Sequence, residues 1–169
     1  GGSYCTGGAG VAVGLGGSQS GVSYQLYLGA TPLGSAVSGT GSAINFGLKT
    51  TAGTYTVVAT DPSTGCNATM SGNPTIVMNR NPNAYDVYNE GTGFYCPYTA
   101  GLHVGLRNST PGISYELYNT GVATGIIVPG SSSDIDFGLQ TAGDYTVVAT
   151  NSTTGCTANM NLNAVITAS

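Results

Sequence analysis

Hydrophobic residues alternate with small or polar residues along most of this chain, with a period of two. Such alternation is typical of β-strands that bury one face and expose the other. Three clear examples in the first half are Val11, Val13 and Leu15; Val22, Tyr24, Leu26 and Leu28; and Tyr55, Val57 and Ala59. The period of an amphipathic helix does not occur. The pattern therefore predicts an all-β protein.

The second half of the chain repeats the first. The offset is 91 in the earlier blocks (4 to 95, 24 to 115, 46 to 137) and 90 in the later ones (52 to 142, 65 to 155). Matching blocks are Tyr4-Cys5 and Tyr95-Cys96, Tyr24-Gln25-Leu26-Tyr27 and Tyr115-Glu116-Leu117-Tyr118, Phe46-Gly47-Leu48 and Phe137-Gly138-Leu139, and Gly65-Cys66 and Gly155-Cys156. This conserved order predicts two copies of one module.

Each copy contains several more short candidate strands separated by Gly or Pro. We predict them at 33–38, 43–47, 66–70 and 74–78, and at 122–128, 133–138, 156–160 and 162–167. Many short strands with such turns are typical of a sandwich. The predicted fold is two tandem immunoglobulin-like antiparallel β-sandwich domains, residues 1–80 and 84–169, joined by an extended linker around Pro82. Tyr55 and Tyr145, each two residues after a Gly, are candidate tyrosine corners.

The four cysteines fall as one pair in each copy. Four cysteines allow three pairings, and the repeat favours Cys5 with Cys66 and Cys96 with Cys156, because both copies would then be closed alike. On the chain-entropy argument each bond would stabilise its domain by about 4 kcal/mol. Disulfides also indicate an oxidising compartment, so we expect a secreted, extracellular protein.

Residues 84–91 have no counterpart before Gly1. They include a candidate first strand for the second copy that the first copy lacks. Either the chain is part of a longer array, or a neighbouring molecule supplies that strand to the first copy. The candidate strand-exchange or junction segment is Ala84, Tyr85, Asp86, Val87 and Tyr88.

Charged residues make up only 6% of the chain, and three of them are basic. Three cations cannot neutralise a row of phosphates, which excludes nucleic acid as a partner. No apolar stretch is long enough to insert into a membrane, and the first residues lack a secretion leader, so a mature or excised segment is expected. Low charge also weakens self-repulsion and suits contact with neighbouring repeats or other copies.

The blocks quoted above, together with Ala52-Gly53-Thr54-Tyr55-Thr56-Val57-Val58-Ala59-Thr60, resemble the Ig-like and PKD-like repeats of large Bacteroidetes cell-surface adhesins and gliding-associated proteins. Those repeats often carry Tyr-Gln-Trp-Tyr, where this chain has Leu26 and Leu117 in place of Trp. The resemblance covers nearly the whole chain. It implies an extracellular stalk or spacer in a long array, and it transfers no binding residue.

Candidate catalytic chemistry is sparse. Asp134 and Asp136 lie on one face of a predicted strand and form a weak calcium candidate, although a solvated strand end is the favoured explanation. The single histidine, His103, has no counterpart in the first copy and no nearby nucleophile. We therefore predict no enzyme activity, no metal and no cofactor.

Three functions remain open from the residues. The first is a structural or adhesive stalk of a cell-surface protein. The second is a subunit of a self-assembling extracellular filament with strand exchange between subunits. The third is a module that binds surface glycans or proteins through the divergent segments 97–112 and 119–133 of the second repeat.

Overall fold

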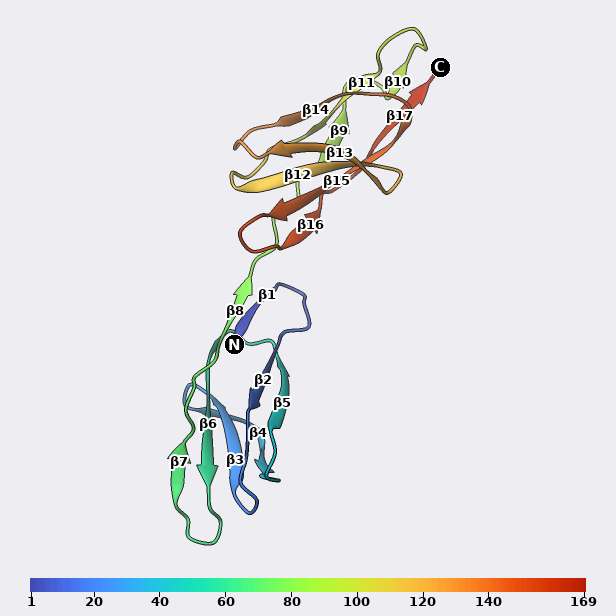
Figure 1. The fold of residues 1–169 in the computed structure, drawn as a ribbon. Coiled ribbons are helices and arrows are strands. Elements are labelled where there is room, and N and C mark those ends of the chain that lie inside the picture. Colours follow the sequence, from blue (N-terminus) through green and yellow to red (C-terminus); the bar gives the residue numbers. More distant parts are fainter. The chain divides into compact units, whose positions relative to one another are not determined.

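The computed structural model describes all residues 1–169 and contains seventeen strands, β1 to β17, and no helix (Figure 1). The chain divides into two compact units, Gly1–Asn79 and Arg80–Ser169. Each unit is a sandwich of two sheets, which confirms the predicted all-β, immunoglobulin-like architecture.

The first unit has one large and one small sheet. The large sheet has the order β1-β8-β6-β3-β4, with β7 also paired to β6, and the small sheet is the pair β2–β5. The strands are β1 (Gly2–Cys5), β2 (Val11–Leu15), β3 (Ser23–Leu28), β4 (Thr31–Ser38), β5 (Ile44–Lys49), β6 (Gly53–Thr60), β7 (Asn67–Thr69) and β8 (Thr75–Asn79).

The second unit repeats this arrangement with one additional strand. Its large sheet has the order β10-β17-β15-β12-β13, with β16 paired to β15, and its small sheet is β14-β11-β9. The strands are β9 (Val87–Asn89), β10 (Phe94–Tyr95), β11 (Leu102–Leu106), β12 (Ile113–Asn119), β13 (Val122–Pro129), β14 (Ile135–Gln140), β15 (Gly143–Asn151), β16 (Thr157–Asn159) and β17 (Ala164–Ala168). The predicted first strand within 84–89 is thus present, shortened to β9.

Two pairings differ from the predicted antiparallel sandwich. Strand β1 runs parallel to β8, with Gly2 opposite Ile76 and Cys5 opposite Asn79, and β10 runs parallel to β17. In the second unit the incoming chain first pairs with β11 as β9 and then crosses to the other sheet as β10. Strands β1 and β10 were not predicted because they are short and carry too few residues to show an alternating pattern.

Each unit buries its own core between its two sheets. The alternating positions found in the sequence supply most of it, including Tyr24, Leu26, Tyr55 and Val57 in the first unit. Leu26 and Leu117 are 1% and 0% exposed. Leucine therefore fills the central position where the resembling repeats often have tryptophan.

Both predicted tyrosine corners are present. The phenol of Tyr55 donates a 2.7 Å hydrogen bond to the carbonyl of Thr51, four residues earlier, and Tyr145 donates to Thr141 at 3.1 Å. Both rings are buried. Each phenol therefore fixes the turn that begins a long strand in the middle of its sheet, β6 or β15.

Replacing Tyr55 with Phe should lower the free energy of unfolding of the first unit by about 1 kcal/mol, because one buried hydrogen bond is lost while the ring still packs. Urea unfolding followed by tyrosine fluorescence measures this. Tyr98→Phe is the matched control, since that side chain is fully exposed and should change nothing. Equal stability of Y55F and Y98F would contradict the structural role of this hydrogen bond.

Candidate functional site

The cysteines are not paired as the sequence predicted. Cys5 and Cys156 are each disulfide-bonded, whereas Cys66 and Cys96 carry free, exposed thiols. The predicted within-copy bonds Cys5–Cys66 and Cys96–Cys156 are therefore wrong.

In each copy, one long strand separates the two cysteines and keeps them too far apart to form a bond. In the first unit Cys5 lies opposite Asn79, the last residue of β8. Only the first two residues of β8 pair with β6, and they lie opposite the first two residues of β6. Asn79 and Cys5 therefore lie beyond the start of β6. Cys66 lies beyond the other end of β6, where its carbonyl accepts a hydrogen bond from the amide of Asp61. The eight residues of β6 span about 25 Å, whereas a disulfide joins Cα atoms within about 7 Å.

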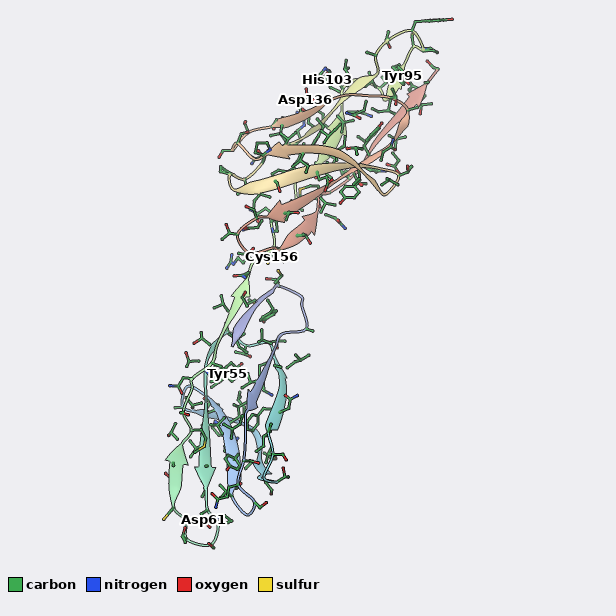
Figure 2. All side chains as sticks on the ribbon, in the orientation of Figure 1. Tyr55, Asp61, Tyr95, His103, Asp136 and Cys156 are labelled. Atoms are coloured by element: carbon green, nitrogen blue, oxygen red, sulfur yellow. The ribbon has the colours of Figure 1, made fainter.

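The second unit has the same geometry. Cys96 follows Tyr95, which pairs with Ala168 at one end of the large sheet. Cys156 follows the far end of β15, where the amide of Asn151 donates to its carbonyl. Figure 2 shows Tyr95 and Cys156 at opposite ends of this unit. Each module therefore carries one cysteine at each end.

Cys66 and Cys156 are presented by the same preformed turn. The amides of Gly65 and Gly155 donate 2.8 Å hydrogen bonds to the carbonyls four residues earlier, and both glycines have a positive φ, 73° and 72°. In the first unit the side chain and amide of Ser63 also donate to Asp61. These hydrogen bonds lower the pKa of Asp61.

A depression with a volume of about 390 Å³ lies beside Cys66. Its lining includes Gln19, Val22, Asp61 and Met70. All of these residues belong to the first unit, so the depression is complete within one module.

The equivalent surface of the second unit lies against a segment of the chain. A hollow there is lined by Thr110, Ile113 and Asn151, which correspond to Gln19, Val22 and Asp61, and by residues 80–83 of the linker. Tyr85 follows shortly after this linker, and its hydroxyl lies within hydrogen-bonding distance, 2.9 Å, of the Thr110 hydroxyl.

Backbone and core contacts hold the rest of this segment. The amide of Tyr85 lies 3.4 Å from the sulfur of Met160, and its carbonyl accepts from Asn161. Met160 is buried, whereas its counterpart Met70 is only half-buried. Positions that face the depression in the first unit are thus covered in the second.

The edge of the small sheet differs between the units in the same way. In the second unit β9 pairs antiparallel with β11, and Val87 is 2% exposed. Tyr88 packs over Gly105, where an added Cβ would meet the phenol ring at 2.5 Å, and the guanidinium of Arg107 lies over that ring, 3.9 Å from its centroid. Strand β2 of the first unit pairs only with β5 and has a free edge.

The structure thus gives the predicted junction segment a defined place. Tyr85 and Val87 pack into the core of the second unit, Asp86 bridges to Asn161, and Tyr88 covers Gly105. Ala84 connects the linker to these contacts. Whether a similar segment is exchanged between molecules stays a prediction.

Asp134 and Asp136, the weak calcium candidates, each engage two donors. Asp134 accepts from the amide of Asn108 at 2.8 Å and from Arg107 at 3.1 Å. Asp136 accepts from the His103 ring at 2.7 Å and from the amide of Gly138 at 2.8 Å. A cation would have to displace these donors, and no group of three or more His, Cys, Asp or Glu side chains is gathered for a metal.

Asp136 has a structural counterpart in the first unit. The side-chain oxygen of Asn45 accepts from the amide of Gly47 at 2.8 Å, as Asp136 does from Gly138. Both glycines have a φ near 80° inside a strand, opposite a shift in register. The side-chain acceptor at this position therefore stabilises a β-bulge in each unit. In the first unit this acceptor is the neutral side chain of Asn45.

Each divergent segment of the second repeat contains one strand and the turns that flank it. Residues 97–112 include β11, and residues 119–133 include β13. Binding of glycans or proteins by these segments stays a prediction. No helix in the structure has the length and apolar character needed to cross a bilayer.

Comparisons with known proteins reveal a similar fold only. No family model matches the chain, and no curated protein matches its sequence. Among solved structures, the chain is similar to fibronectin(III)-like modules of Clostridium thermocellum CbhA, with a TM-score of 0.43 and 12% identity, covering 98% of this chain and 89% of that one. It is also similar to a chain of a cytokine receptor complex, with a TM-score of 0.29 and 14% identity, covering 83% and 84%. The immunoglobulin-like class therefore rests on the strand order described above.

The carboxyl groups of Asp134 and Asp61 should titrate below their ordinary value of 3.8. For Asp134 the largest cause is the Asn108 amide, followed by Arg107. A lowered pKa in the folded state stabilises it above the unfolded value, and this contribution is lost as pH falls through the folded value. Carbon-detected NMR titration measures both midpoints.

Arg107→Gln provides the control for this titration. It should raise the Asp134 midpoint only in part, because the Asn108 amide still donates, and it should leave Asp61 unchanged. An Asp134 midpoint at or above 3.8 in the wild-type chain would show that these hydrogen bonds do not persist in solution.

Proposed function

We propose that this chain is a structural module of an extracellular repeat array, a stalk or spacer that carries tension in a cell-surface adhesin, and that it has no catalytic activity. The observation that carries the proposal is the parallel pairing of β1 with β8. The remaining support is the tandem repeat, the disulfide-bonded cysteines and the resemblance to surface repeats.

Parallel pairing of the first and last strands gives a module mechanical strength. Tension pulls the N-terminal end of β1 and the C-terminal end of β8 in opposite directions along the same axis. All hydrogen bonds between the two strands are then loaded together in shear, instead of opening one after another. Thr6 extends this pairing, since its amide donates to the carbonyl of Asn79 at 2.9 Å.

Core and surface chemistry fit the same role. A charge content of 6% and a surface of Ser, Thr, Gly and Asn provide few groups for catalysis. Oxidising conditions outside the cell permit the disulfide. Antibody labelling of intact cells of the source organism tests the location, and labelling only after permeabilisation would contradict it.

Single-molecule pulling of the chain, with reductant present so that no disulfide shares the load, tests the mechanical role. Thr6→Pro should lower the unfolding force of the first unit, because it removes the amide that donates to Asn79. Thr6→Val is the matched control, since it keeps that amide and loses only the side-chain hydroxyl. Equal unfolding forces for T6P and T6V would contradict a load-bearing role for this strand pair.

A second candidate function is a filament subunit that exchanges a strand with its neighbours. The observations that favour it are the free edge of β2 and the uncovered depression of the same unit. A segment like residues 80–89 of another copy would supply both missing contacts: a strand for β2, and a cover for Val22 and Met70.

A synthetic peptide of residues 80–91 should bind the first unit if this edge accepts a strand. Hydrogen exchange should then slow at the amides of β2 in proportion to peptide concentration. The control peptide carries Val87→Asp, which places a charge at a buried position. Unchanged exchange at β2, or equal protection by both peptides, would argue against strand exchange.

A further inference from the structure

We propose that a glycine-centred bulge closes the outer edges of β4 and β13 to pairing with a strand of a second copy of this chain. Each of these strands lies at one edge of the large sheet of its unit. The closure goes beyond the proposed function and does not depend on it, because it concerns a partner that each module excludes. The contacts that produce it lie within a single unit in both cases.

Strands β4 and β13 have the features that make an edge strand prone to pair with another chain. Each contains eight residues, most of them exposed. Val122 and Ile127 of β13 are 69% and 58% exposed, and Val37 of β4 is 38% exposed. A long edge with exposed apolar side chains presents a row of unpaired amides and carbonyls to any other strand. Such an edge is a site of self-association unless something interrupts it.

Both edges are interrupted near their middle by a bulge. In the first unit residues 34–36 of β4 lie opposite the single residue Gln25 of β3. In the second unit residues 124–126 of β13 lie opposite the single residue Leu117 of β12. The stretches of one-to-one pairing on either side of each bulge are two or three residues long, whereas a typical strand has about five to six. A second strand therefore cannot pair along the whole edge.

Gly34 and Gly125, which correspond at the offset of 91, set the shape of the bulge. Their φ angles are 66° and 78°, in the left-handed region that glycine adopts without steric cost. No atom lies within 4 Å of the place where a Cβ would stand at either position. The backbone conformation of the bulge therefore requires glycine here, and a lack of space does not.

A side chain supplies the hydrogen bond for the β3 or β12 carbonyl that faces the bulge. In the first unit the side-chain amide of Gln25 donates to the carbonyl of Leu26 at 2.9 Å. The counterpart of Gln25 is Glu116, and an ionised carboxylate only accepts hydrogen bonds. In the second unit the hydroxyl of Thr124 donates instead, at 2.7 Å, to the carbonyl of Leu117, the counterpart of Leu26.

This exchange of donors preserves the bulge in two different sequences. The glutamine donor is absent from the second copy, and a hydroxyl at position 124, where the first copy has Leu33, takes its place. Neither copy leaves the carbonyl unpaired, which would be costly beside a buried leucine. In an array of similar modules, identical edges meet at high local concentration, and wrong pairing between modules is a characteristic failure. Closed edges prevent it.

Point variants test the donors. Thr124→Val should lower the folding equilibrium constant of the second unit by about tenfold, because the carbonyl of the buried Leu117 loses its donor. Adding Glu116→Gln should recover most of this loss, since a glutamine at the equivalent position reaches that carbonyl in the first unit. Hydrogen exchange of the β12 amides measures both effects, and Thr146→Val, at an exposed position of β15, is the matched control. Equal stability of T124V with and without E116Q would contradict the exchange of donors.

Deletion of the two surplus residues tests the closure. Removing Thr124 and Gly125 leaves Ile126 opposite Leu117 and restores one-to-one pairing, and removing residues 34–35 does the same in the first unit. Analytical ultracentrifugation of the full chain in reductant should give each deletion variant a dimer dissociation constant at least tenfold below that of the wild-type chain. Ile127→Lys added to the second-unit deletion should reverse this, because a lysine on an exposed edge opposes strand pairing.

Hydrogen exchange shows whether the deletion variants fold and whether the edge strand is newly protected. Folded variants that remain as monomeric as the wild-type chain would overturn the proposal. Dimers that Ile127→Lys does not weaken would also overturn it, since they would form through another surface. Loss of the folded state in both deletion variants would overturn it as well, because the bulge would then be needed for the fold of the module itself.

Discussion

The fixed reach of a disulfide, set against the length of a β-strand, governs how this protein is linked. An eight-residue strand lies between the two cysteines of the first repeat, and a nine-residue strand does so in the second. At about 3.3 Å per residue neither separation is compatible with an S–S bond. The cysteines therefore mark the two ends of a module and cannot close it. What stabilises each module is its core of alternating residues and its buried tyrosines.

Several features of the first unit have one common explanation. The free edge of β2, the depression beside Cys66 and the half-buried Met70 are separate observations. Their counterparts in the second unit all lie against the segment that precedes β11, from the linker at residues 80–83 to β9. The one segment of residues 80–89 thus accounts for all three of these differences between otherwise matched surfaces.

Sequence predicted the modules well and their linkage poorly. Alternation located the long strands because each buries one face, and the Gly-x-Tyr pattern located Tyr55 and Tyr145 because a corner needs that spacing. The short strands β1 and β10 were missed. The cysteine pairing was wrong for a different reason: a repeat shows which cysteines correspond, but not at which end of a strand each cysteine lies.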